Sequence, residues 1–237
     1  GAALLLSLTT FSQSPSPSPS DGPLGGYTIS GNTEVGARWV GVNGDEDKFR
    51  SDINQRSGFK FFDSSVRFDN NNAGSRFVDS GLIMASGWGS DPSGSVRANI
   101  EKKGTFRLDT NIRRVALFND LRNHAIGDTR INYHNYNIKR NFGDLDLTIF
   151  PESQKFRLRL GGSYNLQSDP FTYTSRASNA FPVEATSRAK AFDYRIGADT
   201  QLLGFNISGT YGFREFIDRT SYRLLGPNEG DVVDTRV

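Results

Sequence analysis

Residues Lys155 to Gln167 read KFRLRLGGSYNLQ, and this stretch decides the fold. Apolar and polar side chains alternate along it. The apolar set is Phe156, Leu158, Leu160, Tyr164 and Leu166. The polar set between them is Lys155, Arg157, Arg159, Ser163, Asn165 and Gln167. Because successive side chains of a strand point to opposite faces, the stretch predicts a β-strand with one apolar and one polar face.

The same alternation recurs along most of the chain. It is clear again near the C-terminus, where an apolar set alternates with polar residues: Phe205, Ile207, Tyr211 and Phe213. We predict nine strands, at 27–42, 58–69, 77–89, 95–102, 105–118, 136–150, 155–167, 190–202 and 205–216. No segment shows a comparable helical period with good caps, so we predict an all-β fold.

Strand length favours a membrane-spanning sheet over an ordinary one. The segment 156–166, about 11 residues long, would extend about 36 Å at ~3.3 Å per residue. Tilted by about 45°, it would span roughly 25 Å, the height of the apolar band of an outer-membrane barrel. The predicted connections 103–104, 151–154 and 203–204 are short, whereas 43–57, 119–135 and 168–189 are long and polar. Such barrels alternate short turns with long external loops, although 91–94 is shorter than an external loop usually is.

Composition narrows the classes of function. Phe occurs 18 times and Met once, and Gly reaches 25 residues, which favours strands and turns over helices. The net charge is +2 with no block of like charges, which argues against a nucleic-acid partner. The absence of Cys excludes thiolate metal sites, Fe–S clusters and disulfides. We therefore expect no resident cofactor.

The first residues predict export. The apolar segment in 1–13 is typical of a secretory signal peptide whose start is missing, and 14–24 is a Ser-Pro-rich extended linker. The barrel would occupy 25–237. Nine strands is an odd number for a bacterial single-chain barrel, and an unclosed sheet leaves edges that lipid cannot satisfy. We therefore predict an antiparallel transmembrane β-barrel of which these strands form the N-terminal part.

Short motifs add a family resemblance. Residues 26–38 read GYTISGNTEVGAR and 44–54 read GDEDKFRSDIN, followed by Gly58-Phe59 and by GWGSDP at 87–92. This arrangement, an E-x-G-x-R strand followed by a Gly/Asp loop with K-[FY]-R, resembles the opening of the MtrB/PioB-type outer-membrane barrels over about residues 26–105. The resemblance implies a barrel of well over twenty strands that sheathes a multihaem cytochrome in electron transfer across the outer membrane. Some members carry an N-terminal Cys-x-x-Cys pair, which this chain lacks.

The alternation also assigns side chains to two environments. We predict a set of lumen-facing polar residues: Glu34, Arg38, Arg97, Glu101, Arg157, Arg159, Asp193, Arg195 and Arg214. The predicted lipid-facing set is Phe156, Leu158, Leu160, Tyr164, Leu166, Phe205, Ile207, Tyr211 and Phe213. The lumenal cations, Arg107 included, either line a channel or simply pair across strands with carboxylates. The candidate carboxylates are Glu34, Glu101, Asp109, Asp193 and Asp199.

Other candidate sites are weaker. His124 and His134 lie near Asp120 and Asp128 in a polar loop, where such residues are more often solvated than catalytic. Ca²⁺ binding at 45–47 or 69–72 would use oxygen ligands, but neither run has the spacing of an EF-hand loop. Aromatic residues near strand ends could form membrane girdles: Trp39, Trp88, Phe118 and Tyr222.

Taken together, these features predict a non-enzymatic protein of the bacterial outer membrane. Its function would be that of a porin-like conduit or of the sheath of a multihaem cytochrome, so its partners would be lipid and that cytochrome, and haem would enter only through the partner. The alternative is a soluble secreted β-sandwich or surface-binding module, in which the apolar faces pack against each other. A third hypothesis, a membrane-embedded hydrolase, would need a local catalytic signature that the sequence does not show.

Overall fold

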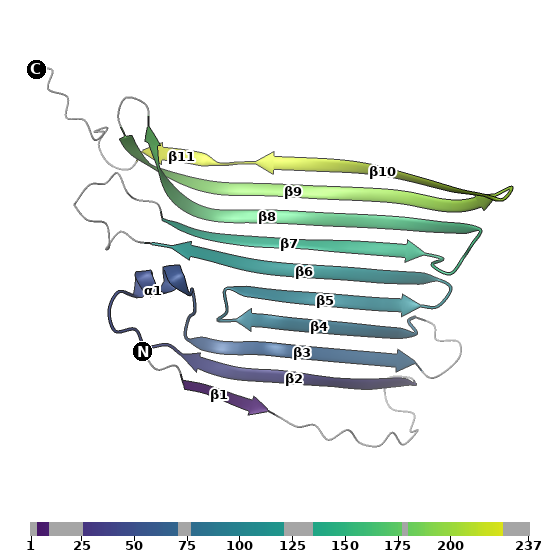
Figure 1. Ribbon diagram of the computed structural model, residues 1–237, viewed down its shortest axis with the longest axis horizontal. Helices are drawn as coiled ribbons and strands as arrows, with labels where there is room; N and C mark the ends of the chain where they lie inside the picture. The colour runs from purple at the N-terminus through teal and green to yellow at the C-terminus, as the bar shows by residue number, and fades with distance from the viewer. Residues whose placement is uncertain (1–3, 10–25, 71–76, 121–134, 177–179, 225–237) are drawn as a thin grey trace, which may run out of the picture.

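The computed structural model describes residues 4–9, 26–70, 77–120, 135–176 and 180–224. These residues form one 11-stranded antiparallel sheet in which β1 to β10 lie side by side in chain order, and β11 also pairs with β9 (Figure 1). The strands are β1 (Leu4–Thr9), β2 (Tyr27–Trp39), β3 (Gly58–Asn70), β4 (Ser80–Gly89), β5 (Ser93–Lys102), β6 (Phe106–Asn119), β7 (Tyr136–Ile149), β8 (Phe156–Arg176), β9 (Ala180–Leu202), β10 (Phe205–Asp218) and β11 (Ser221–Leu224).

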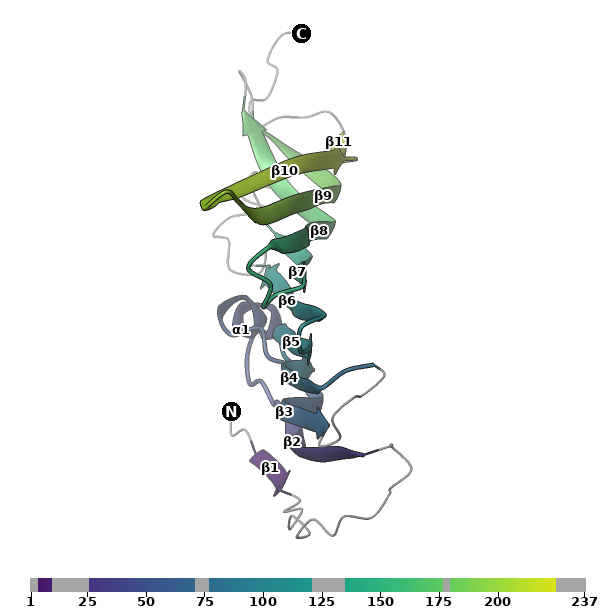
Figure 2. The ribbon, with the colours of Figure 1, turned by 90° about the vertical axis from the view of Figure 1, so that its right-hand side faces the viewer.

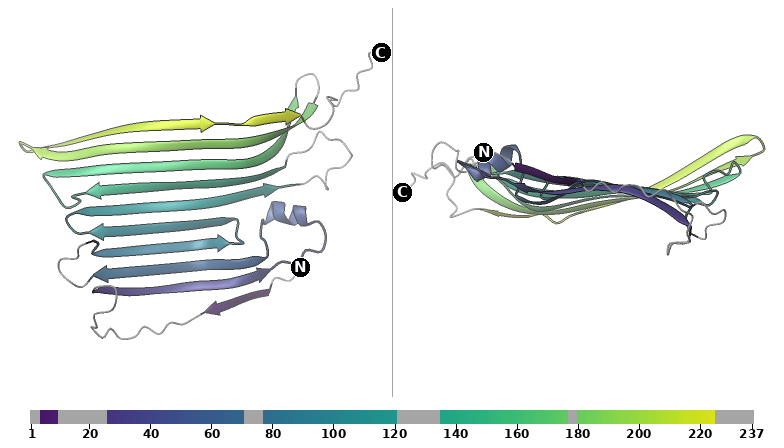
Figure 3. Two further views of the ribbon diagram at one scale, coloured as in Figure 1. Left: turned by 180° about the vertical axis from the view of Figure 1, so that it is seen from behind. Right: turned by 90° about the horizontal axis from the view of Figure 1, so that it is seen from below.

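The sheet is a single open layer. Seen edge-on it is one strand thick, with a twist that is strongest at β8 to β10 (Figures 2 and 3). Among the described residues no second sheet packs on either face, and the only buried hydrophobic residues are Ala98, Val183 and Ala185. The all-β antiparallel prediction is therefore confirmed, whereas the described part of the chain is open rather than closed into a barrel.

All nine predicted strands are present as β2 to β10, and their ends differ from the prediction by a few residues except at the C-terminal end of β8 and the N-terminal end of β9. The predicted long loop at 168–189 is wrong, because β8 and β9 continue through most of it. These two strands are 21 and 23 residues long and pair without a register shift from Phe156↔Thr200 to Arg176↔Ala180. They project beyond the rest of the sheet at the end where α1 lies (Figure 1).

The predicted loop 43–57 contains a helix, α1 (Glu46–Asp52), that sequence analysis did not predict. Asp45 caps it, since its carboxylate accepts a hydrogen bond from the Lys48 backbone N–H. Glu46 and Asp47 in the first turn and Arg50 in the last turn complement the helix dipole. Good capping thus compensates for a helix of only two turns. No helix in the described ranges is long and apolar enough to cross a membrane.

Connections differ between the two ends of the strands. At one end, β5–β6, β7–β8 and β9–β10 join through the short connections predicted. The tightest is Leu203–Gly204, where both residues have positive φ (50° and 82°), as a two-residue type I′ hairpin requires. At the other end the segments that follow β2 and β6 are longer, although β4–β5 and β8–β9 join there through three residues each, and we call this the loop end. The opposite end is the turn end.

β1 lies within the predicted signal peptide. The apolar core of the predicted signal peptide, 1–13, forms β1 and pairs with β2 from Leu4↔Trp39 to Thr9↔Glu34. Its removal on export stays a prediction. The predicted linker, 14–24, lies outside the described residues.

Candidate functional site: the two faces of the sheet

One face of the sheet is apolar across its whole width. Directly paired residues of an antiparallel sheet share a face, so the register defines rows that run across the strands. One such row crosses β2 to β10 as Ile29, Phe68, Gly81, Ile100, Leu108, Leu147, Leu160, Ile196 and Tyr211. We call this side the apolar face. It is largely uncovered: the exposed fraction is 49% for Ile196 and 69% for Tyr211.

Charged residues stand only near the ends of the apolar face, with one exception in the described strands. Lys102 marks the turn end, and Arg114, Lys139 and Lys190 mark the loop end. The exception is Glu215, which is paired with Phe192. On β9 the uncharged stretch runs from Phe192 to Leu202, about 33 Å along the strand at ~3.3 Å per residue. This length matches a tilted membrane-spanning strand.

β9 exchanges its faces beyond this stretch. From residue 192 toward the turn end, the apolar face of β9 carries Phe192, Tyr194, Ile196 and Ala198. From residue 190 toward the loop end, the same side carries polar residues, namely Lys190, Arg188, Thr186 and Glu184. On the opposite side the change is reversed, from Asp193 and Arg195 to buried Ala185 and Val183. Because β9 has no register shift against β8, the exchange reflects the sequence and not a bulge.

Aromatic side chains from the loop-end parts of β8 and β11 form a small cluster on the side opposite the apolar face. Tyr173 stacks on Phe171 with ring centroids 6.1 Å apart and meets the edge of Tyr222 at 6.4 Å. β11 places Tyr222 in this cluster, on the side opposite the apolar face, and its role in a membrane girdle stays a prediction. The register of β2, β4 and β6 puts the other girdle candidates, Trp39, Trp88 and Phe118, at the loop end of the apolar face.

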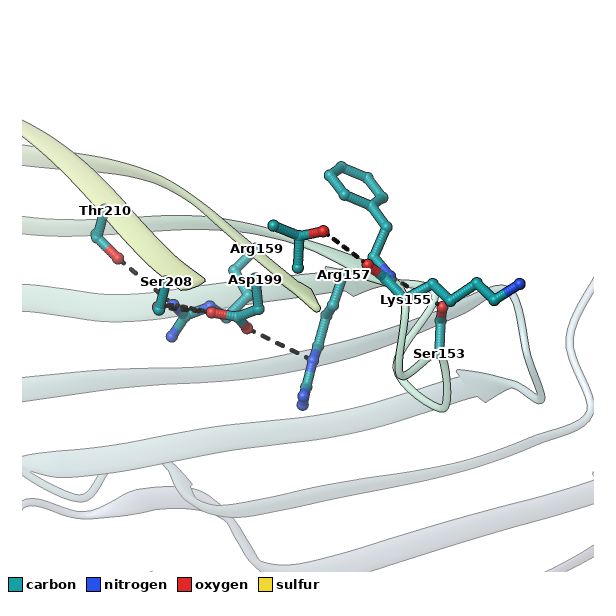
Figure 4. Close-up of polar contacts among 9 residues, drawn as sticks. Ser153, Lys155, Arg157, Arg159, Asp199, Ser208 and Thr210 are labelled. Carbon is teal, nitrogen blue, oxygen red and sulfur yellow. Dashed lines mark hydrogen bonds and ion pairs between the residues drawn. The ribbon is translucent and has the colours of Figure 1, made fainter. Parts of the chain in front are cut away.

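The opposite face, which we call the polar face, is held together by ion pairs. Asp199 forms ion pairs with both Arg157 (3.5 Å) and Arg159 (2.9 Å), as Figure 4 shows. Asp193 pairs with Arg214 and accepts from the Ser163 hydroxyl. These contacts confirm the hypothesis of cross-strand pairing for Asp193 and Asp199. Further along the face, Arg107 pairs with Glu101 at 3.1 Å, and Asp109 accepts a hydrogen bond from Asn99.

Two arginines lie flat across a neighbouring strand, and each passes over a glycine. Arg195 of β9 crosses Gly161 of β8 to reach Asp146 of β7 at 3.2 Å. Arg159 of β8 crosses Gly197 of β9 and donates to Ser208 (3.1 Å) and Thr210 (3.5 Å) of β10 (Figure 4). A Cβ on Gly161 would lie 2.9 Å from the Arg195 Nε. The glycines therefore leave the space in which the guanidinium groups lie.

The register places all nine predicted lumen-facing residues on the polar face and all nine predicted lipid-facing residues on the apolar face. What each face meets stays a prediction. Glu34 and Arg97 make no ion pair with any described residue, so pairing does not explain them. Sequence analysis missed Lys60, which is 2% exposed and shares Asp91 with Arg38, and it missed Asp146 as the partner of Arg195.

At the loop end, α1 lies against the part of β6 that extends past the short β4–β5 hairpin. β5 pairs with β6 only as far as Val115. Beyond it, Asn54 Nδ2 donates to the Ala116 carbonyl (2.8 Å), and the Asp120 N–H donates to the Ser51 hydroxyl (2.8 Å). The Arg50 guanidinium lies 3.6 Å from the Phe118 ring centroid, and burial lowers the pKa of Arg50, an effect to which Arg56 adds. The helix thus satisfies a strand edge that the hairpin leaves unpaired.

The weaker predicted sites gain no support. In the described ranges no group of three or more His, Cys, Asp or Glu side chains could hold a metal ion. At the Ca²⁺ candidates, Asp45 caps α1 and Asp69 pairs with Arg67 at 2.6 Å. His124 and His134 lie outside the described residues. Comparison of the chain with family models, with curated proteins and with solved structures gave no match.

Proposed function

We propose that this chain forms part of the wall of a bacterial outer-membrane β-barrel, with the apolar face toward lipid and the polar face toward an aqueous interior. The observation that carries the proposal is the exchange of faces on β9 between Lys190 and Phe192. Only the membrane segment of a strand is surrounded by hydrocarbon, so a strand that leaves the bilayer no longer needs an apolar side toward lipid, and charged residues are tolerated there. The change from apolar to charged side chains on this side of β9 fits such a boundary.

The single layer supports the same proposal. An apolar side chain is stabilised by about 1.5–3 kcal/mol when it is fully removed from water, and this face presents such side chains on every strand from β2 to β10. Soluble domains cover such a face with a second layer. A β-sandwich would need that layer, and the described residues do not form one. Lipid would cover the face without it.

The polar face would then line the interior. Most of its arginines are paired with aspartates, and Arg159 and Arg195 lie flat across a neighbouring strand, which gives a polar, hydrated wall suited to hydrophilic solutes or to an enclosed soluble protein. A porin-like conduit is the broader proposal. The resemblance to MtrB/PioB-type barrels supports a narrower one, the sheath of a multihaem cytochrome. The chain has no Cys to which haem could be attached covalently, so covalently attached haem in such a complex would be carried by the partner.

Membrane integration is tested by fractionation of cells that express the full-length protein. We expect it in the outer-membrane fraction, resistant to extraction with urea at high pH. The proposal is lost if the protein is recovered in the soluble periplasmic fraction.

The two interior roles are separated by purification and by electrical recording. The sheath predicts a haem protein that co-purifies with the barrel in mild detergent and low conductance in planar bilayers while that partner is bound. The conduit predicts purification without haem and a steady ohmic conductance. A haem-free preparation would contradict the sheath alone.

A further inference from the structure

Four cations cluster on the apolar side of the sheet just beyond the uncharged stretch. Three of them lie in one row across the strands: Lys139 on β7, Arg188 on β9 and Arg219 in the segment that follows β10, with Ser168 of β8 between Lys139 and Arg188. Lys190 lies in the adjacent row, paired with Leu166 and Ile217. Lys139, Arg188, Lys190 and Arg219 are all exposed, and we call them the basic belt.

The basic belt differs from the polar face in how its charges are satisfied. On the polar face Arg157, Arg159, Arg195 and Arg214 each pair with an aspartate. In the belt, Arg188, Lys190 and Arg219 make no ion pair with any described residue, and Lys139 has only Asp169 at 3.7 Å. The other nearby carboxylate on this side is Glu184, which pairs with Arg223, while Glu215 lies one row toward the uncharged stretch.

Arg188 and Arg219 lie opposite each other, with the Arg219 N–H bound to the Arg188 carbonyl at 3.2 Å. Like charges directly opposite on adjacent strands destabilise a sheet. An anion between the two guanidinium groups would reverse this effect, because each presents a planar pair of donors that fits a phosphate. The arrangement therefore calls for an anionic ligand that the described chain does not supply.

We propose that the basic belt binds the phosphate groups of anionic lipid headgroups in the leaflet nearest the loop end. This inference rests on the proposed membrane function, because the exchange of faces places the belt at headgroup depth. The aliphatic stems of Lys and Arg lie along apolar surface while their charged ends reach the headgroups. The belt would fix the height of the sheet in the bilayer.

The test uses the full-length protein in vesicles of equal phosphatidylcholine and phosphatidylglycerol. After extraction in mild detergent, mass spectrometry gives the ratio of the two lipids that remain bound. We expect enrichment of phosphatidylglycerol on the wild type and a loss of at least about fivefold in R188Q/R219Q, since each cation near an anionic surface contributes roughly that factor. R188K/R219K should keep most of the enrichment.

The matched control is K48Q/R56Q, which removes the same charge at the loop end but outside the belt, and it should retain the wild-type ratio. If R188Q/R219Q does not insert, Lys190→Gln replaces it and should lower the ratio by itself. An equal ratio of bound phosphatidylglycerol to phosphatidylcholine on the wild type and on the belt variants overturns the inference. Displacement of the bound phosphatidylglycerol by low-millimolar inorganic phosphate overturns it too. A protein that fails to enter vesicles contradicts the proposed function instead.

Discussion

At the scale of single residues, the polar face depends on where the glycines are. Arg195 reaches Asp146 because Gly161 lies between them and has no side chain. Gly162, the next residue, points to the apolar face, where an added Cβ would meet only the Asp193 carbonyl oxygen at 3.7 Å. Two adjacent glycines of one strand therefore have different roles, and only the first makes room for an ion pair.

Gly161→Val should be less stable than Gly162→Val by about 1 kcal/mol, the cost of forcing one side chain out of its rotamer. Valine at 161 displaces Arg195, whereas valine at 162 adds a β-branched side chain to an open surface. The measurement is urea unfolding of each variant in lipid vesicles. Equal stability of the two variants would show that the Arg195 path over Gly161 has no energetic role.

At the scale of elements, α1 closes the strand edge that the short β4–β5 hairpin exposes. The contact depends on Asn54, whose φ of 53° is in the left-handed region that Asn tolerates better than most residues. Its side chain then reaches the Ala116 carbonyl. This backbone conformation and hydrogen bond thus add to the Ser51 and Arg50 contacts that hold α1 against β6.

Asn54→Gly should keep this conformation and lose only the hydrogen bond, while Asn54→Ala should add backbone strain of roughly 1 kcal/mol. Both should accelerate amide exchange at Asp120, whose N–H is held by Ser51 of α1, and Asn54→Ala should do so more strongly. Asp52→Ala, which breaks only an exposed pair with Lys48, should leave this exchange rate unchanged. A protected Asp120 in both Asn54 variants would contradict this account of α1.

The elements that the sequence predicts well are those with one uninterrupted period. The presence of β2 to β10 follows from alternation, and so does the assignment of residues such as Arg159 and Leu160 to opposite faces. The register shift between β2 and β3 at Glu34/Val35 does not follow from it. The extensions of β8 and β9 were missed because the apolar side changes there. The alternation continues, but the side that was apolar becomes polar, so the sequence of this segment resembles a polar loop. α1 was missed because a two-turn helix shows too little periodicity, although Asp45 is a recognisable cap. Contacts across two strands, such as Arg195 to Asp146, need the register.

At the scale of the whole molecule, depth along a strand should determine how well a charge is tolerated on the apolar face. Leu160 lies in the middle of the uncharged stretch, and Leu166 lies in the row that ends at Lys190 and Ile217. Both residues are on β8 and on the same face, so they differ mainly in depth. A bilayer and a packed protein core predict different outcomes for a charge at these two positions.

Leu160→Arg should destabilise the protein in vesicles by about 2–4 kcal/mol, because the guanidinium would lie near the bilayer midplane. Leu166→Arg should cost at most about 1 kcal/mol, because its charge can reach the headgroups. Urea unfolding in vesicles of fixed composition gives both values. A similar cost at the two positions would indicate a buried core in place of lipid.

The most direct measurement is a spin-label scan of β9 from residue 184 to residue 202 in the full-length protein in lipid vesicles. Accessibility to oxygen reports lipid, and accessibility to a nickel chelate reports water. We predict oxygen maxima at 192, 194, 196, 198 and 200, nickel maxima at the odd positions between them, and no oxygen maxima from residue 184 to residue 190. Uniformly low accessibility at both sets of positions would place this strand in a protein core and contradict the account.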